Sequence, residues 1–65
     1  MDMYEKFEKL LEKQNISAYR VAKETGLYPT LFSEWKHGKS KPKIDKIKKV
    51  ADYFGVDINY FIKED

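Results

Sequence analysis

The chain has 65 residues, enough for one small domain and too few for two. It contains no cysteine and one histidine, His37, which excludes disulfides, thiolate zinc sites and most general-base schemes. We therefore expect no enzyme activity, no metal and no cofactor, and no small-molecule ligand is evident. No apolar run approaches the ~20 residues of a membrane span and no signal peptide is present, so we expect a cytoplasmic protein without membrane contact.

The net charge of +2 is unevenly distributed along the chain. Residues 17–43 carry six basic and two acidic side chains, whereas residues 1–16 and 44–65 each have one more acid than base. The positive charge is therefore concentrated in the middle third. An anionic partner would be attracted there first.

A first helix is predicted over about residues 3–14. Asp2 with Glu5 three positions later matches a capping box. Asn15 tolerates the left-handed backbone that ends helices. Between them, one side of the helix carries a stripe at helical spacing, made of Met3, Phe7, Leu10, Leu11 and Gln14.

The next two helices are short and closely spaced. Ser17 is a good N-cap and Gly26 a stop, which predicts a helix over about 18–25 with Val21 and Ala22 facing inward. Pro29 fits only the first turn of a helix, so a third helix is predicted from Pro29 to His37, closed by Gly38. Three residues, 26–28, separate the two helices, which is the layout of a helix-turn-helix.

Two further helices complete an all-α chain of five helices. A basic loop over 39–43 precedes a fourth helix that ends at Gly55, and Asp57 is expected to cap a short fifth helix. The expected inward residues of these two helices are Ile44, Ile47, Val50, Ala51, Phe54, Ile58, Phe61 and Ile62. We interpret residues 1–65 as one domain built around one core.

The spacing of several residues resembles a known family of DNA-binding domains. The chain is similar to the Cro/cI-type, lambda-repressor-like (XRE-type) helix-turn-helix domains of phage and bacterial regulators, from about Phe7 to Ile62. The matching positions are Val21, Ala22, Gly26, Leu27, Phe32, Trp35, Gly38, Pro42, Phe54, Gly55 and Val56. The resemblance implies a compact five-helix bundle, bacterial or phage-encoded, whose second and third helices form the helix-turn-helix.

The chain departs from the family pattern at four positions, one of which is His37, where the family usually has an asparagine before the glycine. Ala18 stands where the family commonly has a glutamine that helps hold a phosphate, so that contact is absent or replaced, for example by Tyr19. Leu11 and Lys36 stand where the family often pairs an arginine with a glutamate. Because both halves of this ion pair are replaced together, stability need not suffer.

The resemblance places the third helix in the major groove of DNA, with its N-terminal residues at the base edges. The expected base-reading residues are Tyr28, Pro29, Thr30, Leu31, Ser33 and Glu34. This helix offers no Arg, Gln or Asn for bidentate base contacts, so we expect modest direct readout supported by DNA shape. Structural roles instead of base contact remain open for two of these residues. Leu31 can be partly buried in the core, and Glu34 can face solvent or pair with Lys39.

Phosphate contacts would fix the orientation of such a domain on DNA. The expected phosphate-binding residues are Ser17, Tyr19, Lys36, His37, Lys39, Lys41 and Lys43. The loop lysines can alternatively serve only to solubilise the loop. His37 can simply interact favourably with the dipole at the C-terminal end of the third helix. The lysines of the fourth helix are interpreted as a solvated surface, whereas Phe32 and Trp35 are expected in the core.

These observations favour a sequence-specific regulator that binds double-stranded DNA, with repression implied by the resemblance. Few base contacts per domain predict a homodimer on an operator with two half-sites. Candidate interface residues are Tyr53, Ile58, Tyr60 and Ile62, which can equally complete the core. A protein-interaction module and an antitoxin with the same fold remain alternatives.

Overall fold

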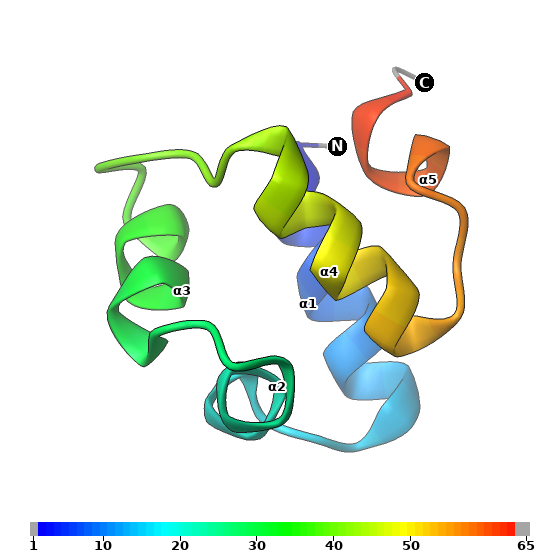
Figure 1. Cartoon of the computed structure of the whole chain (residues 1–65), viewed down its shortest axis with the longest axis horizontal. Coiled ribbons are helices and arrows are strands. Elements are labelled where there is room, and N and C mark those ends of the chain that lie inside the picture. The colour runs from blue at the N-terminus through cyan, green and yellow to red at the C-terminus, as the bar shows by residue number, and fades with distance from the viewer. Residues whose placement is uncertain (1, 64–65) are drawn as a thin grey trace.

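The computed structural model describes residues 2–63, which form five helices and no strand (Figure 1). The helices are α1 (Met3–Gln14), α2 (Ala18–Thr25), α3 (Pro29–Lys36), α4 (Ile44–Phe54) and α5 (Asn59–Ile62). In Figure 1, α2 and α3 lie on one side of α4, and α5 lies on the other. α2 packs against α3 and α4, while α5 packs against α1 and α4. The predicted all-α, five-helix class is confirmed.

The predicted helix ends rest on capping interactions that the structure contains. Asp2 and Glu5 form the capping box at the start of α1, and Asn15 ends this helix in the left-handed conformation at φ 56°. The Ser17 side chain accepts a hydrogen bond from the backbone N–H of Arg20 at the start of α2. Gly26 ends α2 at φ 80°, a backbone conformation that favours glycine.

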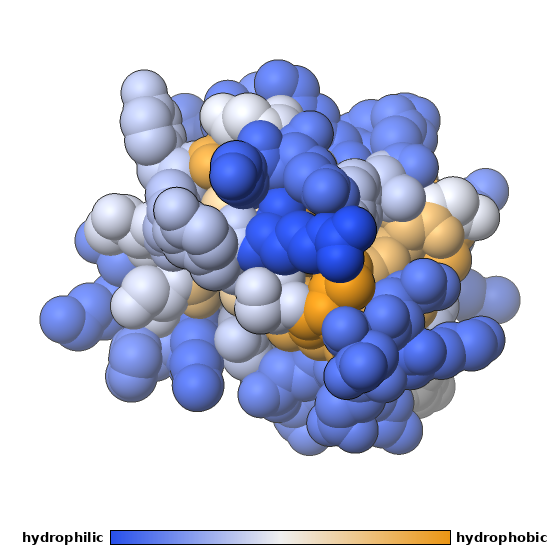
Figure 2. Space-filling model, turned by 90° about the horizontal axis from the view of Figure 1, so that it is seen from below, coloured by the Kyte–Doolittle hydropathy of each residue, from blue (hydrophilic) through white to orange (hydrophobic). Residues whose placement is uncertain are grey.

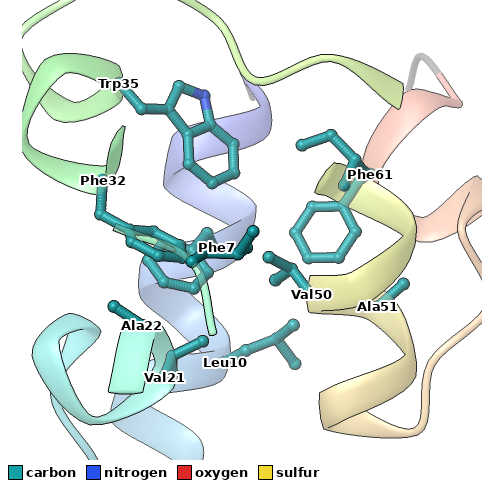
Figure 3. Packing of buried hydrophobic residues seen from close by; sticks show 11 residues of the cluster. Phe7, Leu10, Val21, Ala22, Phe32, Trp35, Val50, Ala51 and Phe61 are labelled. Carbon is teal, nitrogen blue, oxygen red and sulfur yellow. The ribbon is translucent and has the colours of Figure 1, made fainter. Parts of the chain in front are cut away.

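The core is organised around the Phe7 ring (Figure 3). Phe7 is fully buried and stacks on Phe32 and Trp35, with centroid distances of 5.1 and 5.3 Å. Both predicted core aromatics of α3 are therefore confirmed. Burial of each such side chain contributes roughly 1.5–3 kcal/mol, which attaches α3 firmly to α1. The other members of the buried apolar cluster are Leu10, Val21, Ala22, Leu27, Ile47, Val50, Ala51 and Phe61.

Five details differ from the sequence predictions, all at helix ends. α3 ends at Lys36, one residue early, and His37 is its C-cap. Gln14 and Ile44, the last residue of α1 and the first of α4, are exposed because the predicted stripes continue past the buried cluster. Ile62, the last residue of α5, is likewise 46% exposed. The fifth helix starts at Asn59 rather than directly after Asp57, whose carboxylate accepts the Asn59 backbone N–H at 2.8 Å.

Two hydrogen bonds that the sequence did not reveal join α1 to α5. Lys6, only 7% exposed, donates from Nζ to the carbonyl oxygen of Lys63 at 2.7 Å. In the other direction, the Tyr60 hydroxyl donates to the carbonyl oxygen of Lys6 at 3.1 Å. Together these bonds fix the short α5, which has too few residues to be stable as an isolated helix.

The surface is predominantly hydrophilic on the face where α2 lies. Figure 2 shows this face, with hydrophobic residues confined to a few separate areas. Within residues 2–63, none of the helices combines the length and the apolar character needed to cross a membrane.

Candidate nucleic-acid interface

The α2–turn–α3 unit is positioned by its buried residues. Leu27, in the turn, is 7% exposed, and Pro29 occupies the first turn of α3, where its missing N–H has no cost. Phe32 and Trp35 hold one side of α3 against the core. The opposite side of this helix consequently faces solvent.

A groove of about 560 Å³ lies between α3 and the segment that leads into α4, and we call it the α3–loop groove. Its residues come from the start and middle of α3, from the basic loop and from the first turn of α4. They are Tyr28, Thr30, Leu31, Glu34, Ser40, Lys41, Pro42, Lys43, Asp45 and Lys46. Three lysines against two carboxylates leave the groove with one excess positive charge.

Four of the six predicted base-reading residues line this groove: Tyr28, Thr30, Leu31 and Glu34. Tyr28 is 79% exposed at the N-cap of α3, so its ring is free to meet a ligand. Leu31 is half-buried against the core, as one of its two interpretations predicted. Pro29 and Ser33 are exposed but do not line the groove.

Glu34 connects α3 to the basic loop. Its carboxylate accepts a hydrogen bond from the Ser40 hydroxyl at 3.3 Å, and its carbonyl oxygen accepts the Lys39 backbone N–H at 2.9 Å. A side-chain pair with Lys39, one of the alternatives for Glu34, is not among the ion pairs of residues 2–63. The Glu34 contact with Ser40 was missed, because nothing in the sequence showed that the loop folds back on α3.

The predicted phosphate-binding lysines are all exposed, but only some share the groove. Lys41 and Lys43 line it, whereas Lys36 and Lys39 do not. Within residues 2–63, no carboxylate lies within 4.0 Å of these four ammonium groups. Lys46, which the sequence assigned to a solvated surface, also lines the groove, at 3.8 Å from the Asp45 carboxylate.

Ser17 and Tyr19 lie at the start of α2, outside the α3–loop groove. The Ser17 hydroxyl oxygen already accepts the Arg20 N–H at 3.1 Å, so it acts as a helix cap. Tyr19 is 66% exposed. Its phenol can therefore reach a phosphate only if DNA extends from α3 across the start of α2.

His37 lies at the C-terminal end of α3. Its Nδ1 is 2.8 Å from the carbonyl oxygen of Ser33, a distance that fits an N–H donated to the last turn of the helix. Lys and His side chains at this end also interact favourably with the helix dipole. His37 therefore has a local structural role, and its second ring nitrogen remains open to solvent.

An exposed polar network connects α2 to α4. Arg20 Nε lies 3.2 Å from the Glu24 carboxylate, which also accepts a hydrogen bond from the Tyr53 hydroxyl. The hydrogen bonds from Tyr53 and Arg20 lower the pKa of Glu24 below its usual 4.5. The bond to Glu24, assisted by desolvation, raises the pKa of Tyr53 above its usual 10.0.

Residues 2–63 contain no group of three or more His, Asp or Glu side chains arranged to hold a metal ion.

The geometry agrees with the comparison of the sequence with protein families. The sequence pattern of a helix-turn-helix domain family matches residues 4–64. The chain belongs to this family. Comparisons with curated proteins and with solved structures gave no match.

Membership of the helix-turn-helix family agrees with the Cro/cI-type resemblance. The structure also shows the surroundings of the residues at which this chain differs from the family pattern. Leu11 packs partly buried against the core, where an ion-pairing side chain would have needed a partner. Lys36 is exposed, so no charge is buried at this position. Ala18 also packs against the buried cluster, so the start of α2 is held by apolar contact.

Proposed function

We propose that this protein is a transcriptional regulator that binds double-stranded DNA in a sequence-specific manner. α3 enters the major groove, and the residues that meet base edges are Tyr28, Pro29, Thr30, Leu31, Ser33 and Glu34. The phosphate-binding residues are Ser17, Tyr19, Lys36, His37, Lys39, Lys41 and Lys43. Occupation of an operator represses transcription by blocking the promoter.

The observation that carries this proposal is the α3–loop groove. It combines an exposed helix of a helix-turn-helix with two lysines, Lys41 and Lys43, that have no carboxylate partner in residues 2–63. Thr30 offers a hydroxyl that can donate or accept at a base edge, and Leu31 offers an apolar contact for a thymine methyl. Base readout and phosphate contact are thereby available on one surface.

The proposal includes a homodimer on two half-sites. One copy presents few polar base-reading side chains. Two copies bound together distinguish the operator from other DNA sequences more strongly than one copy does. The candidate contact surface includes Tyr60 and Ile62, which are 36% and 46% exposed on α5. Ile58 and Tyr53 are partly buried against the core and contribute at the edge.

Selection from a random duplex library tests sequence recognition, followed by a salt titration on the enriched site. A short, nearly palindromic sequence with a steep salt dependence is the expected result. Absence of enrichment, together with absence of affinity for any duplex at ~50 mM salt, contradicts DNA binding and favours a protein-interaction module.

Lys41→Ala provides the matched test of the groove. Loss of one phosphate contact should weaken binding to all sequences alike and reduce the log–log salt slope by about 0.9. Lys49→Ala is the control, because Lys49 is an exposed lysine on α4 that does not line the groove. Equal effects of the two substitutions would remove Lys41 from the phosphate-binding residues.

A further inference from the structure

A second pocket, of about 470 Å³, lies on another side of the loop that follows α3. It is formed by the first turns of α1, by the loop after α3 and by α5, and we call it the α1–α5 pocket. Its apolar wall includes Tyr4, Trp35 and Phe61. Figure 3 shows Trp35 and Phe61 at the same end of the core, so this wall continues the buried cluster.

The polar lining of this pocket is mainly cationic. Lys6, Lys41 and Lys63 line it, against one carboxylate, that of Asp2. Lys6 is the notable member because it is only 7% exposed and, among residues 2–63, its ammonium donates to one backbone oxygen, that of Lys63. An ammonium has three donors, and burying a cation is unfavourable unless it is neutralised or well hydrogen-bonded. No carboxylate of residues 2–63 lies within 4.0 Å of Lys6.

We propose that the α1–α5 pocket binds a small organic carboxylate with an apolar, preferably aromatic, body. The carboxylate would pair with Lys6 and Lys41, and the body would pack on the partly buried Met3 and Tyr4, beside the edge of Trp35. Mostly apolar walls with a few charged groups are typical of small-molecule sites, and the volume falls within their usual range of ~300–1,000 Å³.

This ligand site adjoins the α3–loop groove. Ser40 and Lys41 line both cavities, so one short segment separates them. A carboxylate paired with Lys41 competes with a DNA phosphate for the same ammonium. The ligand should therefore weaken DNA binding, by about fivefold or more. This regulatory consequence rests on the proposed function, whereas ligand binding itself does not.

Trp35 supplies a direct measurement, because it is the one tryptophan of the chain and lines the pocket. The protein without DNA is titrated with phenylacetate, phenylpropionate and hexanoate while tryptophan fluorescence is followed. At least one should give a saturable change with a Kd of about 1 mM or below, a modest affinity for ligands of this size. Phenylacetamide, which has the shape of phenylacetate without its charge, should bind at least tenfold more weakly.

Variants show whether the ammonium groups cause the binding. Lys6→Met keeps the length of the side chain and should raise the Kd about tenfold. Lys9→Met, on the exposed surface of the same helix, is the control and should leave the Kd unchanged. Lys41→Met tests the pocket independently should Lys6→Met fail to fold.

The outcomes separate the two proposals. No saturable change with any of the carboxylates up to ~10 mM, or equal binding of the amide, overturns the ligand site. The ligand site is also overturned if Lys9→Met weakens carboxylate binding as much as Lys6→Met and Lys41→Met do. The DNA measurement is then repeated with and without the best carboxylate. Ligand binding without duplex affinity refutes only the regulator, whereas duplex affinity that the bound ligand leaves unchanged refutes the coupling.

Discussion

Trp35 belongs both to the core and to the edge of a pocket. It is 5% exposed, and its ring meets Tyr4 edge-on at a centroid distance of 5.3 Å while stacking on Phe7. It joins α3 to α1 through these contacts. Its removal would therefore loosen the helix on which the proposed base contacts depend.

Trp35→Ala should lower the free energy of unfolding by ~3–5 kcal/mol, because the lost ring leaves a cavity among three aromatic neighbours. A domain of this size has little more stability than that, so the variant should be largely unfolded. Circular dichroism during urea titration measures the effect, since the variant has no tryptophan fluorescence. A cooperative transition at the wild-type urea concentration would show that Trp35 does not stabilise the core.

Thr30 is the polar α3 residue in the groove whose side chain forms no hydrogen bond to the loop within residues 2–63. Its hydroxyl forms none of the side-chain hydrogen bonds described there, unlike Glu34, which binds Ser40. Thr30→Ala should reduce the preference for one base pair by about 1–3 kcal/mol and leave binding to the other positions unchanged.

Competition assays with a set of single-base-pair variants of the enriched site measure this effect. Gln14→Ala is the control, because Gln14 is an exposed, uncharged residue of α1 that does not line the groove. Uniform weakening across all sites after Thr30→Ala would assign this hydroxyl to phosphate contact or to helix stability.

At the scale of single residues, the sequence predicts those properties of a side chain that depend on its near neighbours in the chain, such as burial on one side of a helix. Phe32 and Trp35 follow helical spacing and are buried as expected. The hydrogen bonds between Lys6 and Lys63 and between Glu34 and Ser40 were not predicted, because they depend on how distant segments pack. A lysine next to an apolar stripe gives no local signal that a carbonyl 57 positions away will accept its hydrogen bond.

At the element scale, caps explain why the helix boundaries were accessible from sequence. Asp2, Ser17 and Gly26 specify backbone geometry within a few residues, and that geometry is local. α5 was harder to place, because one helical turn is stabilised by packing on α1 and α4 rather than by its own sequence. The sequence predicted residues of the third helix and of the loop as DNA contacts, but not the α3–loop groove, because its shape depends on the path of the loop.

The link between α2 and α4 gives a prediction about pH. Glu24 has a lowered pKa in the folded protein, so it binds a proton less readily there than in the unfolded chain. Its stabilising contribution is present above pH 4.5 and is lost as the pH falls through the lower folded value. Tyr53 has a raised pKa, so its contribution is present below pH 10.0 and is lost as the pH rises through the higher folded value.

Tyr53→Phe removes the largest cause of the Glu24 shift and the phenol itself. The variant should therefore lose less stability than wild type when the pH falls below 4.5, and less when it rises above 10.0. Thermal unfolding across this pH range measures the loss of stability at low pH and at high pH. Tyr19→Phe, which changes an exposed tyrosine on α2, is the control. Parallel pH curves for wild type and Tyr53→Phe would show that the hydrogen bond does not persist in solution.

At the scale of the whole molecule, charge distribution matters more than net charge. A net charge of +2 would attract DNA only weakly. The exposed lysines at positions 36, 39, 41 and 43 follow one another closely, and the acids of α1 lie on a different helix. Binding should therefore orient the protein with α3 and the loop toward the phosphates.

This arrangement predicts the salt dependence of the wild-type complex. If each of these four lysines contacts one phosphate, the log–log slope should be about −3.6 for one copy, and about −7 for two copies on a palindromic site. Titration with monovalent salt on a full site and on an isolated half-site distinguishes the two. A full-site slope twice that of the half-site indicates a bound dimer, whereas equal slopes indicate that one copy binds alone. A slope near zero on both sites would show that these lysines solubilise the loop without contacting phosphate.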